Sequence, residues 1–220
     1  MSWEVIQQAL PLVEKAFVLT LRLSAVSVVL ATLLGLALAL LREYRVPVLA
    51  RIGTVFQELF RNTPLLIQLF FLYYGLPSIG VKWSAETCAV VGMSILGAAY
   101  MCGAFEGGFT GIPRVQNESA RALGLSPLQM IRHVTLPQGL TRSVPAVAAN
   151  VIFMVKETSV FTVIAVPELT NTARDLIGMY YRSDEYLFML VVAYAIILIP
   201  LSVILTLIER RVRRGTFGDN

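Results

Sequence analysis

The chain has 220 residues, of which 56% are hydrophobic and 15% are charged, and its mean hydropathy is +0.72. Ordinary soluble domains of this length are much less apolar, so the composition indicates a polytopic membrane protein. The net charge of +4 does not indicate nucleic-acid binding, because the basic residues lie at the ends of apolar blocks rather than in one dense patch.

The first apolar block predicts a transmembrane helix over residues 16–41, long enough to cross about 30 Å of hydrocarbon at a rise of about 1.5 Å per residue. Ala31, Gly35 and Ala39 recur in it at four-residue spacing, which favours close packing against a neighbouring helix. A basic connector follows, in which Pro47 interrupts any continuous helix. Its basic residues are Arg42, Arg45 and Arg51.

A second transmembrane helix is predicted over residues 54–76, with an interruption at Arg61-Asn62-Thr63-Pro64. Pro64 removes a backbone donor and disfavours helix at Thr63, so we expect a kink whose polar groups face protein or water. A helix that begins at Asn62 or Thr63, with Pro64 in its first turn, explains the same residues equally well.

The third predicted span covers residues 87–110. Gly103, Gly107 and Gly111 are again four residues apart, which favours close packing at a bundle or subunit interface. Glu106 lies within this run near the end of the span, where its burial is costly unless the carboxylate is paired or hydrated.

The polar interval over residues 113–140 predicts two short helices. Asn117 is the expected N-cap of the first helix, which should run to Leu123 and end at Gly124 in a left-handed conformation. Ser126 should cap the second helix in a reciprocal box with Gln129.

Pro137 is expected to end the second helix soon after His133. Helices this short are marginal alone in water, so their apolar side chains should pack against another element. These side chains are Ala120, Leu123, Leu128 and Ile131.

The fourth predicted span covers residues 145–166 and holds Lys156 and Glu157 near its middle. Each such residue costs about 2.5 to 3.5 kcal/mol at a helix centre, so each needs a partner or a wet surface. Asn150 lies one heptad before Glu157 and shares its helix face. The residues predict either a polar translocation path or a structural ion pair between helices.

A loop over residues 167–185 leads to the last predicted span, residues 186–207, which ends in a basic cluster. Alternate loops hold eleven basic residues, and the other three segments hold only Lys15, Lys82, Arg174 and Arg182. The positive-inside rule then places the N-terminus outside and the C-terminus in the cytoplasm. The eleven are Arg42, Arg45, Arg51, Arg114, Arg121, Arg132, Arg142, Arg210, Arg211, Arg213 and Arg214.

Glu118-Ser119-Ala120, followed by Gly124, Ile131 and Leu136-Pro137, resembles the EAA loop of ATP-binding-cassette importer permeases. The flanking motifs resemble the polar amino-acid branch, of the histidine/glutamine/glutamate permease type. These motifs are Arg61-Asn62-Thr63-Pro64-Leu65-Leu66 with Gln68, Lys156-Glu157-Thr158-Ser159-Val160, and Glu168-Leu169-Thr170. The resemblance covers roughly residues 15 to 209.

This resemblance implies a single permease domain over residues 1–220, an all-α integral membrane protein with five transmembrane helices. The EAA-like residues would form a cytoplasmic coupling loop that docks on ABC ATPase subunits, which carry the ATP and Mg. The other implied partners are a second permease subunit, in a homodimer or heterodimer, and an extracytoplasmic solute-binding protein. The location implied is the bacterial cytoplasmic (inner) membrane.

The substrate path would hold an amino acid beside polar residues of the third and fourth spans. They are Glu106, Asn150, Lys156, Glu157, Thr158 and Ser159. The chain departs from the family pattern at two positions, where a glutamate is expected in place of Gly103 and an arginine in place of Glu106.

The chain contains no G-x-x-x-x-G-K-[ST] motif, so it is predicted not to hydrolyse ATP itself. With one histidine and no metal-ligand spacing, neither a metal site nor a membrane enzyme is expected. The alternative function is an ion-gradient-driven secondary transporter or channel subunit, which inverted repeats would favour.

Overall fold

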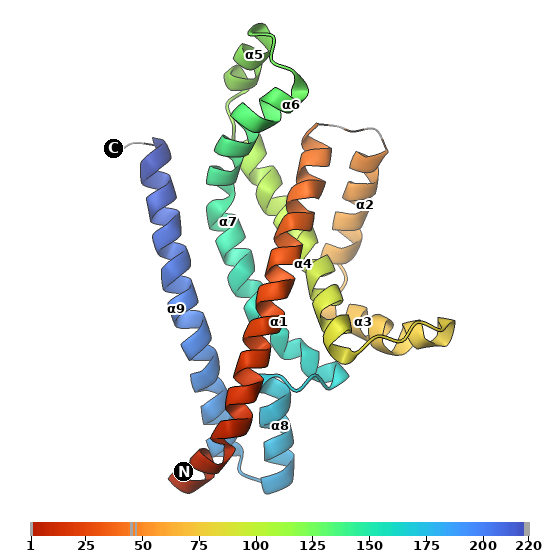
Figure 1. The fold of residues 1–220 in the computed structure, drawn as a ribbon, viewed down its shortest axis with the longest axis vertical. Coiled ribbons are helices and arrows are strands. Elements are labelled where there is room, and N and C mark those ends of the chain that lie inside the picture. Colours follow the sequence, from red (N-terminus) through yellow and green to blue (C-terminus); the bar gives the residue numbers. More distant parts are fainter. Residues whose placement is uncertain (1, 45, 47, 218–220) are drawn as a thin grey trace. The chain divides into compact units, whose positions relative to one another are not determined.

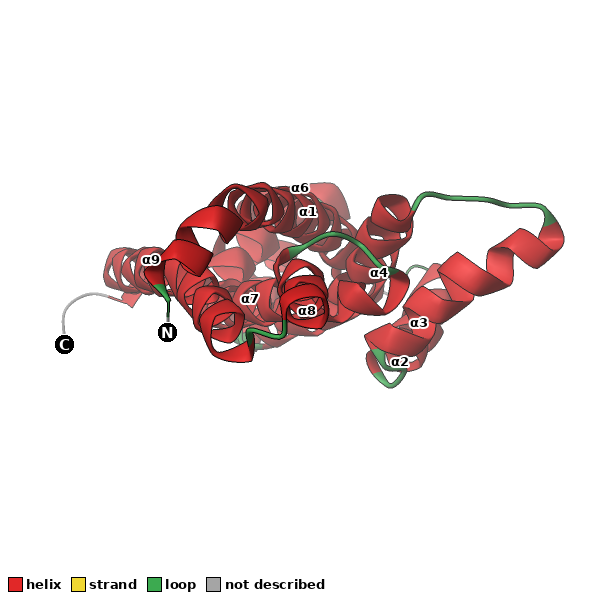
Figure 2. Cartoon of the chain, turned by 90° about the horizontal axis from the view of Figure 1, so that it is seen from below, coloured by secondary structure: helices red, strands yellow, loops and turns green. Residues whose placement is uncertain are grey.

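The computed structural model describes residues 2–44, 46 and 48–217, with side chains to residue 212, and this part contains helices and loops but no strands (Figures 1 and 2). Arg45 and Pro47 of the predicted connector lie outside the described residues. The elements are α1 (Trp3–Glu43), α2 (Leu49–Arg61), α3 (Leu65–Phe70), η1 (Phe71–Gly75), η2 (Leu76–Ile79), α4 (Ala85–Thr110), α5 (Arg114–Ala122), α6 (Pro127–Met130), η3 (Ile131–Thr135), α7 (Leu136–Glu157), η4 (Thr158–Ile164), α8 (Leu169–Tyr180) and α9 (Ser183–Phe217).

Four helical stretches of the described chain are long and apolar enough to cross a membrane: Trp3–Glu43, Ala85–Thr110, Pro127–Ile164 and Ser183–Val212. The predicted all-α membrane class is therefore confirmed. The predicted second span is not one helix, because α2 ends at Arg61 and α3 begins at Leu65 after an extended Pro64. The break falls where Pro64 predicted it, and the count of five spans stays a prediction.

Two predicted proline boundaries are wrong: Pro137 does not end the second short helix of the polar interval, and Pro145 does not begin the fourth span. Pro137 lies in the first turn of α7, and Pro145 lies inside the same helix. A proline in the first turn costs little, since the N–H it lacks would have no partner inside the helix. The preceding π-helical turn η3 joins α6 to α7, so the helical path continues through the residues predicted to end it.

The chain divides into two compact units, each made of segments that are distant in sequence. Unit 1 contains Met1–Val29, Thr63–Ile95 and Ile152–Val203. One of its apolar cores joins α1, α7, α8 and α9 through side chains that are all buried. These side chains are Ala16, Val155, Leu169, Ala193 and Ile197.

Unit 2 contains Leu30–Asn62, Leu96–Val151 and Ile204–Asn220. Here α1 meets α4 at Gly35, where a Cβ atom would lie 2.5 Å from Cβ of Met101. Ala31 and Ala39 are fully buried on the same stripe, which confirms the predicted close packing.

The predicted close packing of the glycine stripe is confirmed in part within unit 2, since a Cβ at Gly103 would lie 3.1 Å from Nε2 of Gln57 on α2 and one at Gly111 would lie 3.5 Å from Cδ of Arg142 on α7. A Cβ at Gly107 would meet no atom within 4 Å in the described chain. The close approach is instead at its neighbour Gly108, where a Cβ would lie 2.4 Å from the carbonyl oxygen of Gly139 on α7. The tightest approach of α4 to α7 therefore lies at Gly108, which is not part of the four-residue spacing.

Candidate functional site

The polar interval forms two short helices of unit 2, α5 and α6, that lie beside each other (Figure 1). Helix α5 begins at Arg114 after Pro113, whose φ of −58° and ψ of 134° bring the extended chain into the helix. Asn117 lies inside α5, so its predicted role as N-cap is wrong. The helix starts four residues earlier than predicted, because Pro113 already fixes the backbone angle that the entry requires.

The turn between α5 and α6 follows the prediction closely. Gly124 has φ +73°, and the N–H of Leu125 donates to the carbonyl of Ala120 at 3.1 Å, which closes the end of α5. Ser126 and Gln129 form the reciprocal box: the N–H of Ser126 donates to Oε1 of Gln129 at 2.8 Å, and the N–H of Gln129 donates to Oγ of Ser126 at 3.4 Å. Hydrogen bonds at both ends therefore fix this turn.

The expectation that the apolar residues of this segment pack inside the chain is only half correct. Ala120 is buried and Ile131 is half-buried, whereas Leu123 is 81% and Leu128 is 72% exposed. Glu118, Ser119 and Pro137 are also exposed, and Leu136 is half-buried. The segment therefore presents two large leucines and a carboxylate to its surroundings.

Tyr44, just after α1, anchors this segment in unit 2, because its hydroxyl and Oγ1 of Thr135 on η3 lie 2.6 Å apart. Burial raises the pKa of Tyr44, and the hydrogen bond to Thr135 partly opposes that effect. A cavity of about 540 Å³ opens beside the pair. It is lined by Glu43, Tyr44, Arg114, Asn117, Glu118, Arg121, Met130 and Thr135.

Glu106 is paired within unit 2. Its Oε1 lies 2.8 Å from Nε of Arg42 at the end of α1, and Arg42 also donates to Oε1 of Gln57 on α2. The expected cost of burying the carboxylate is thereby offset by an ion pair.

The space left by Gly103 is occupied from α2. A Cβ at this glycine would lie 3.1 Å from Nε2 of Gln57 and 3.6 Å from Nη1 of Arg61. The Arg61 guanidinium lies 5.5 Å from the centre of the Tyr100 ring, which is within cation–π range. The two departures from the family pattern therefore lie together in one polar cluster of unit 2.

The residues predicted for the substrate path are divided between the two units. Asn150 belongs to unit 2, where its Nδ2 donates to the carbonyl of Tyr100 at 3.1 Å. Lys156 is exposed and Glu157 is half-buried at the end of α7 in unit 1, and neither makes an ion pair within the described residues. Thr158 is fully buried and Ser159 half-buried at the start of η4.

Unit 1 also contains a helix that the sequence pattern did not predict, α8, whose first residues surround a buried carboxyl group. Glu168 is 0% exposed and caps α8, accepting hydrogen bonds from the N–H groups of Thr170 and Asn171 at 2.8 Å. Tyr194 of α9 links this carboxyl to the predicted path. Its hydroxyl lies 3.5 Å from Oε2 of Glu168 and 3.3 Å from Oγ1 of Thr158.

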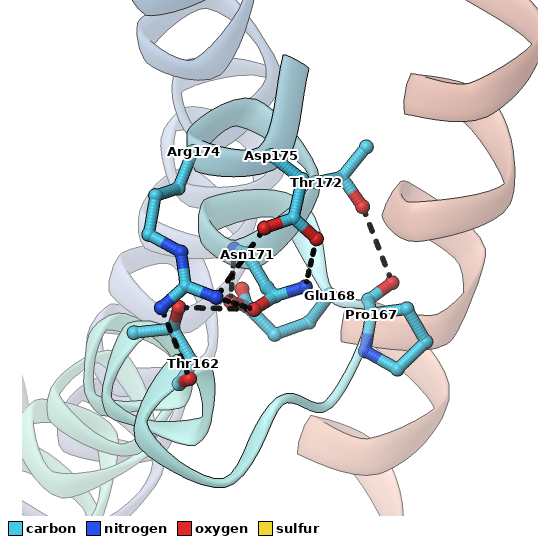
Figure 3. A network of polar contacts seen from close by, with 7 residues as sticks. All are labelled: Thr162, Pro167, Glu168, Asn171, Thr172, Arg174 and Asp175. Atoms are coloured by element: carbon cyan, nitrogen blue, oxygen red, sulfur yellow. Dashed lines mark hydrogen bonds and ion pairs between the residues drawn. The ribbon is translucent and has the colours of Figure 1, made fainter. Parts of the chain in front are cut away.

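Figure 3 shows further polar contacts between η4 and the first turns of α8. Oδ1 of Asn171 accepts from Arg174 at 2.7 Å, and Nδ2 of Asn171 donates to Asp175 at 2.8 Å. Thr162 of η4 donates to the same Oδ1 at 3.3 Å, and its carbonyl accepts from Arg174 at 3.4 Å. Side chains therefore tie η4 to α8 on two sides. The only sequence signal for this junction is the motif Glu168-Leu169-Thr170, to which the sequence assigns no function.

The family model described as "Binding-protein-dependent transport system inner membrane component" matches residues 31–214. The chain is 33% identical over 205 residues to the probable glutamine ABC transporter permease protein GlnP of Bacillus subtilis (strain 168), covering 93% of this chain and 94% of that protein. It is also 33% identical over 214 residues to the glutamine transport system permease protein GlnP of Escherichia coli (strain K12), covering 96% and 98%.

Solved structures have the same fold. The crystal structure of an amino acid ABC transporter with histidines has a TM-score of 0.88 at 29% sequence identity, covering 96% of this chain and 99% of the matched chain. An inward-facing structure of the MetNI methionine ABC transporter has a TM-score of 0.81 at 21% identity, with coverages of 96% and 99%, and its likeness concerns the fold alone.

Proposed function

Because the chain belongs to the family of binding-protein-dependent transport system inner membrane components, we propose that it is the transmembrane subunit of an ATP-driven importer for a polar amino acid. Family membership makes it a multi-pass protein of the bacterial inner membrane and an ABC transporter permease. It also decides against the alternative of a transporter driven by an ion gradient. The amino-acid substrate is inferred from relatives whose names specify glutamine or an amino acid.

The observation that carries the coupling part of the proposal is the surface of α5 and α6. Two leucines, Leu123 and Leu128, are exposed on a turn that hydrogen bonds hold at both ends, beside the exposed carboxylate of Glu118. A rigid apolar protrusion of this kind suits a groove in a partner protein. We propose that the partner is a separate ABC ATPase, which binds ATP and Mg and moves this segment during its cycle.

In unit 1 the substrate would pass beside Lys156, Glu157, Thr158 and Ser159, and in unit 2 beside Glu106 and Asn150. The absence of an ion-pair partner for Lys156 and Glu157 in the described chain supports the path rather than the structural pair. The complete importer would contain two permease subunits, two ATPases and an extracytoplasmic solute-binding protein.

Reconstitution tests the proposed function. The permease is purified with its ATPase, placed in vesicles with the solute-binding protein, and assayed for ATP-dependent uptake in competition with each of the twenty amino acids. Uptake that needs ATP and is blocked by a few polar amino acids supports the proposal. Uptake that persists without ATP and follows an ion gradient contradicts it.

The proposed topology has five spans, with the N-terminus outside and the C-terminus in the cytoplasm. α2 and α3 would together form the second span, broken at Asn62–Pro64. Labelling of single cysteines by a membrane-impermeant reagent in intact cells tests this topology. The exposed residues Arg182 and Arg121 are suitable positions, whereas Ala173 in α8 is buried and is not. Arg182→Cys should be labelled from outside the cell, and Arg121→Cys should not.

A further inference from the structure

Glu168 is a buried carboxyl group that faces no cation in the described part of the chain. Its partners are neutral: the N–H groups of Thr170 and Asn171, and the hydroxyl of Tyr194. A buried carboxylate without a cation carries an uncompensated desolvation cost. The amides at the start of α8 offset part of that cost and leave the rest.

The surroundings of Glu168 come from four elements of unit 1. On α1, Oγ1 of the buried Thr20 accepts from the N–H of Leu169 at 3.2 Å, directly after the carboxyl-bearing residue. Helix α9 contributes Tyr194, whose hydroxyl lies 3.3 Å from Oγ1 of Thr170 and 3.3 Å from Oγ1 of Thr158 on η4. The carboxyl therefore lies where α1, η4, α8 and α9 meet.

The charged groups on these elements have other contacts. Arg174 and Asp175 of α8 pair with each other and with Asn171 on the outer side of the turn (Figure 3). Arg22 of α1 pairs with Glu86 of α4. Lys15, Lys156 and Glu157 make no hydrogen bond or ion pair with the carboxyl, so Tyr194 is the one titratable group that touches it among the described residues.

The backbone beside Glu168 is held in an unusual conformation. Ala165, which ends η4, has φ +54°, in the left-handed region that residues with a side chain rarely adopt. Such residues persist only where the surrounding contacts hold them, and they cluster at functional switches. A change in the contacts of Glu168, three residues later, therefore acts on a segment that is already strained.

We propose that Glu168 is a proton-binding site, and that its protonation fixes the junction of η4 and α8 against α1 and α9. In the protonated form no charge is buried, and the carboxyl can also donate a hydrogen bond to the neighbouring hydroxyls. In the ionised form the carboxylate of Glu168 is more stable in contact with water than when buried, and this weakens the contacts that hold η4 and α8 against α1 and α9. Because η4 begins at Thr158, within the proposed substrate path, external pH would act on transport through this site.

Burial is the largest cause of a rise in the pKa of Glu168 to about 7, and the N–H groups of Thr170 and Asn171 and the hydroxyls of Thr170 and Tyr194 oppose it. The folded protein then binds the proton more tightly than the unfolded chain, whose carboxyl titrates at 4.5. Between these two values the folded state holds more protons, so stability must fall as pH rises.

The test uses the purified full-length chain in lipid nanodiscs, so its outcome does not depend on the transport function. The melting temperature of the wild type should fall by several degrees between about pH 5 and about pH 8. Glu168→Gln, which mimics the neutral form, should lose that part of the dependence. Asp175→Asn, which neutralises an exposed carboxylate on the same helix, should keep it.

A second measurement covers the case in which Glu168→Gln does not fold. Infrared difference spectroscopy follows the carbonyl stretch of a protonated carboxylic acid in the wild type and in Tyr194→Phe. Removing the hydroxyl that faces Oε2 should move the midpoint of this titration to higher pH. An unchanged midpoint, an equal pH dependence in wild type and Glu168→Gln, or a response to sodium instead of pH each overturns the proposal.

Discussion

The side chain of Arg42 lies between two acceptors, the carboxylate of Glu106 and the amide oxygen of Gln57, and so joins three helices of unit 2. Each member of the ion pair has a quarter of its side chain exposed. At that degree of burial, the loss of one partner matters more than the loss of both, because a single remaining charge has no compensation.

Arg42→Met should therefore destabilise the protein by about 1 to 3 kcal/mol, which lowers the melting temperature by several degrees. The double variant Arg42→Met with Glu106→Gln should recover part of that loss. Thermal unfolding of the purified chain measures both variants. If Arg42→Met melts like the wild type, the pair contributes nothing to stability.

Glu157 and Lys156 offer a test of the substrate path. Glu157→Gln keeps the shape and hydrogen-bonding capacity of the side chain and removes its charge, so uptake should fall while complex assembly and ATP hydrolysis remain. The measurement is uptake rate and apparent affinity for several amino acids in reconstituted vesicles. Unchanged uptake would remove Glu157 from the path. Lys156→Met serves as a comparison, because a purely structural lysine would lower the amount of assembled complex instead.

At the scale of elements, the turn between α5 and α6 depends on the left-handed conformation of Gly124. Gly124→Val should strain this position by about 1 to 2 kcal/mol and uncouple ATP hydrolysis from transport. Gly124→Asn is the matched control, since asparagine tolerates the same conformation. The ratio of substrate transported to ATP hydrolysed measures coupling. A normal ratio in Gly124→Val, at normal membrane levels, contradicts the prediction.

The exposed face of α5 carries a separate prediction about assembly. Glu118→Lys should weaken association with the ATPase, because it reverses a charge beside the exposed leucines. Gln116→Lys is the positional control: it introduces a lysine about two hundred degrees around the helix, and it changes the charge by one unit where Glu118→Lys changes it by two. Co-purification of the ATPase with each tagged permease gives the measurement, and undiminished recovery with Glu118→Lys would exclude a contact there.

Local signals at these elements were readable from the sequence when one residue type determined the geometry. Gly124, the Ser126–Gln129 box and the break at Pro64 are of this kind. Signals that depend on packing were not. The sequence predicts a helix end at Pro137 and the start of the fourth span at Pro145, but α7 begins at Leu136 and contains both prolines. Asn117 is a suitable N-cap by residue type, but the N-cap of α5 is Pro113.

Helix α8 was missed for a related reason. Its residues are of mixed polarity and lie between two strongly apolar blocks, so their pattern was taken for a loop. The sequence shows Glu168 only as part of the Glu168-Leu169-Thr170 motif, because a single carboxyl in a predicted loop carries no sign of burial. Its burial arises from Thr20 on α1 and Tyr194 on α9, which no local pattern connects to it.

At the scale of the whole molecule, the composition and the family agree on a polytopic membrane protein, while the two compact units were not readable from the sequence. Each unit takes one part of α1, α4, α7 and α9, so no cut in the chain separates them. The glycine spacing on α4 illustrates the limit. It marked a helix that packs closely, but the tightest approach falls on Gly108, beside the predicted stripe.

The hydrogen bond between Thr20 and Leu169 joins positions 149 residues apart. At the usual pace of synthesis, roughly 7 to 30 s pass between the emergence of the first residue from the ribosome and that of the second. During this interval the N–H of Leu169, from which Thr20 of α1 accepts a hydrogen bond in the folded protein, has not yet been made. The hydroxyl of Thr20 is nevertheless hydrogen-bonded in the lipid, because it donates to the carbonyl of Ala16 within the same helix, at 2.9 Å. Threonine thus gives this position a polar contact for the finished protein without leaving an unsatisfied donor while the chain is still being made.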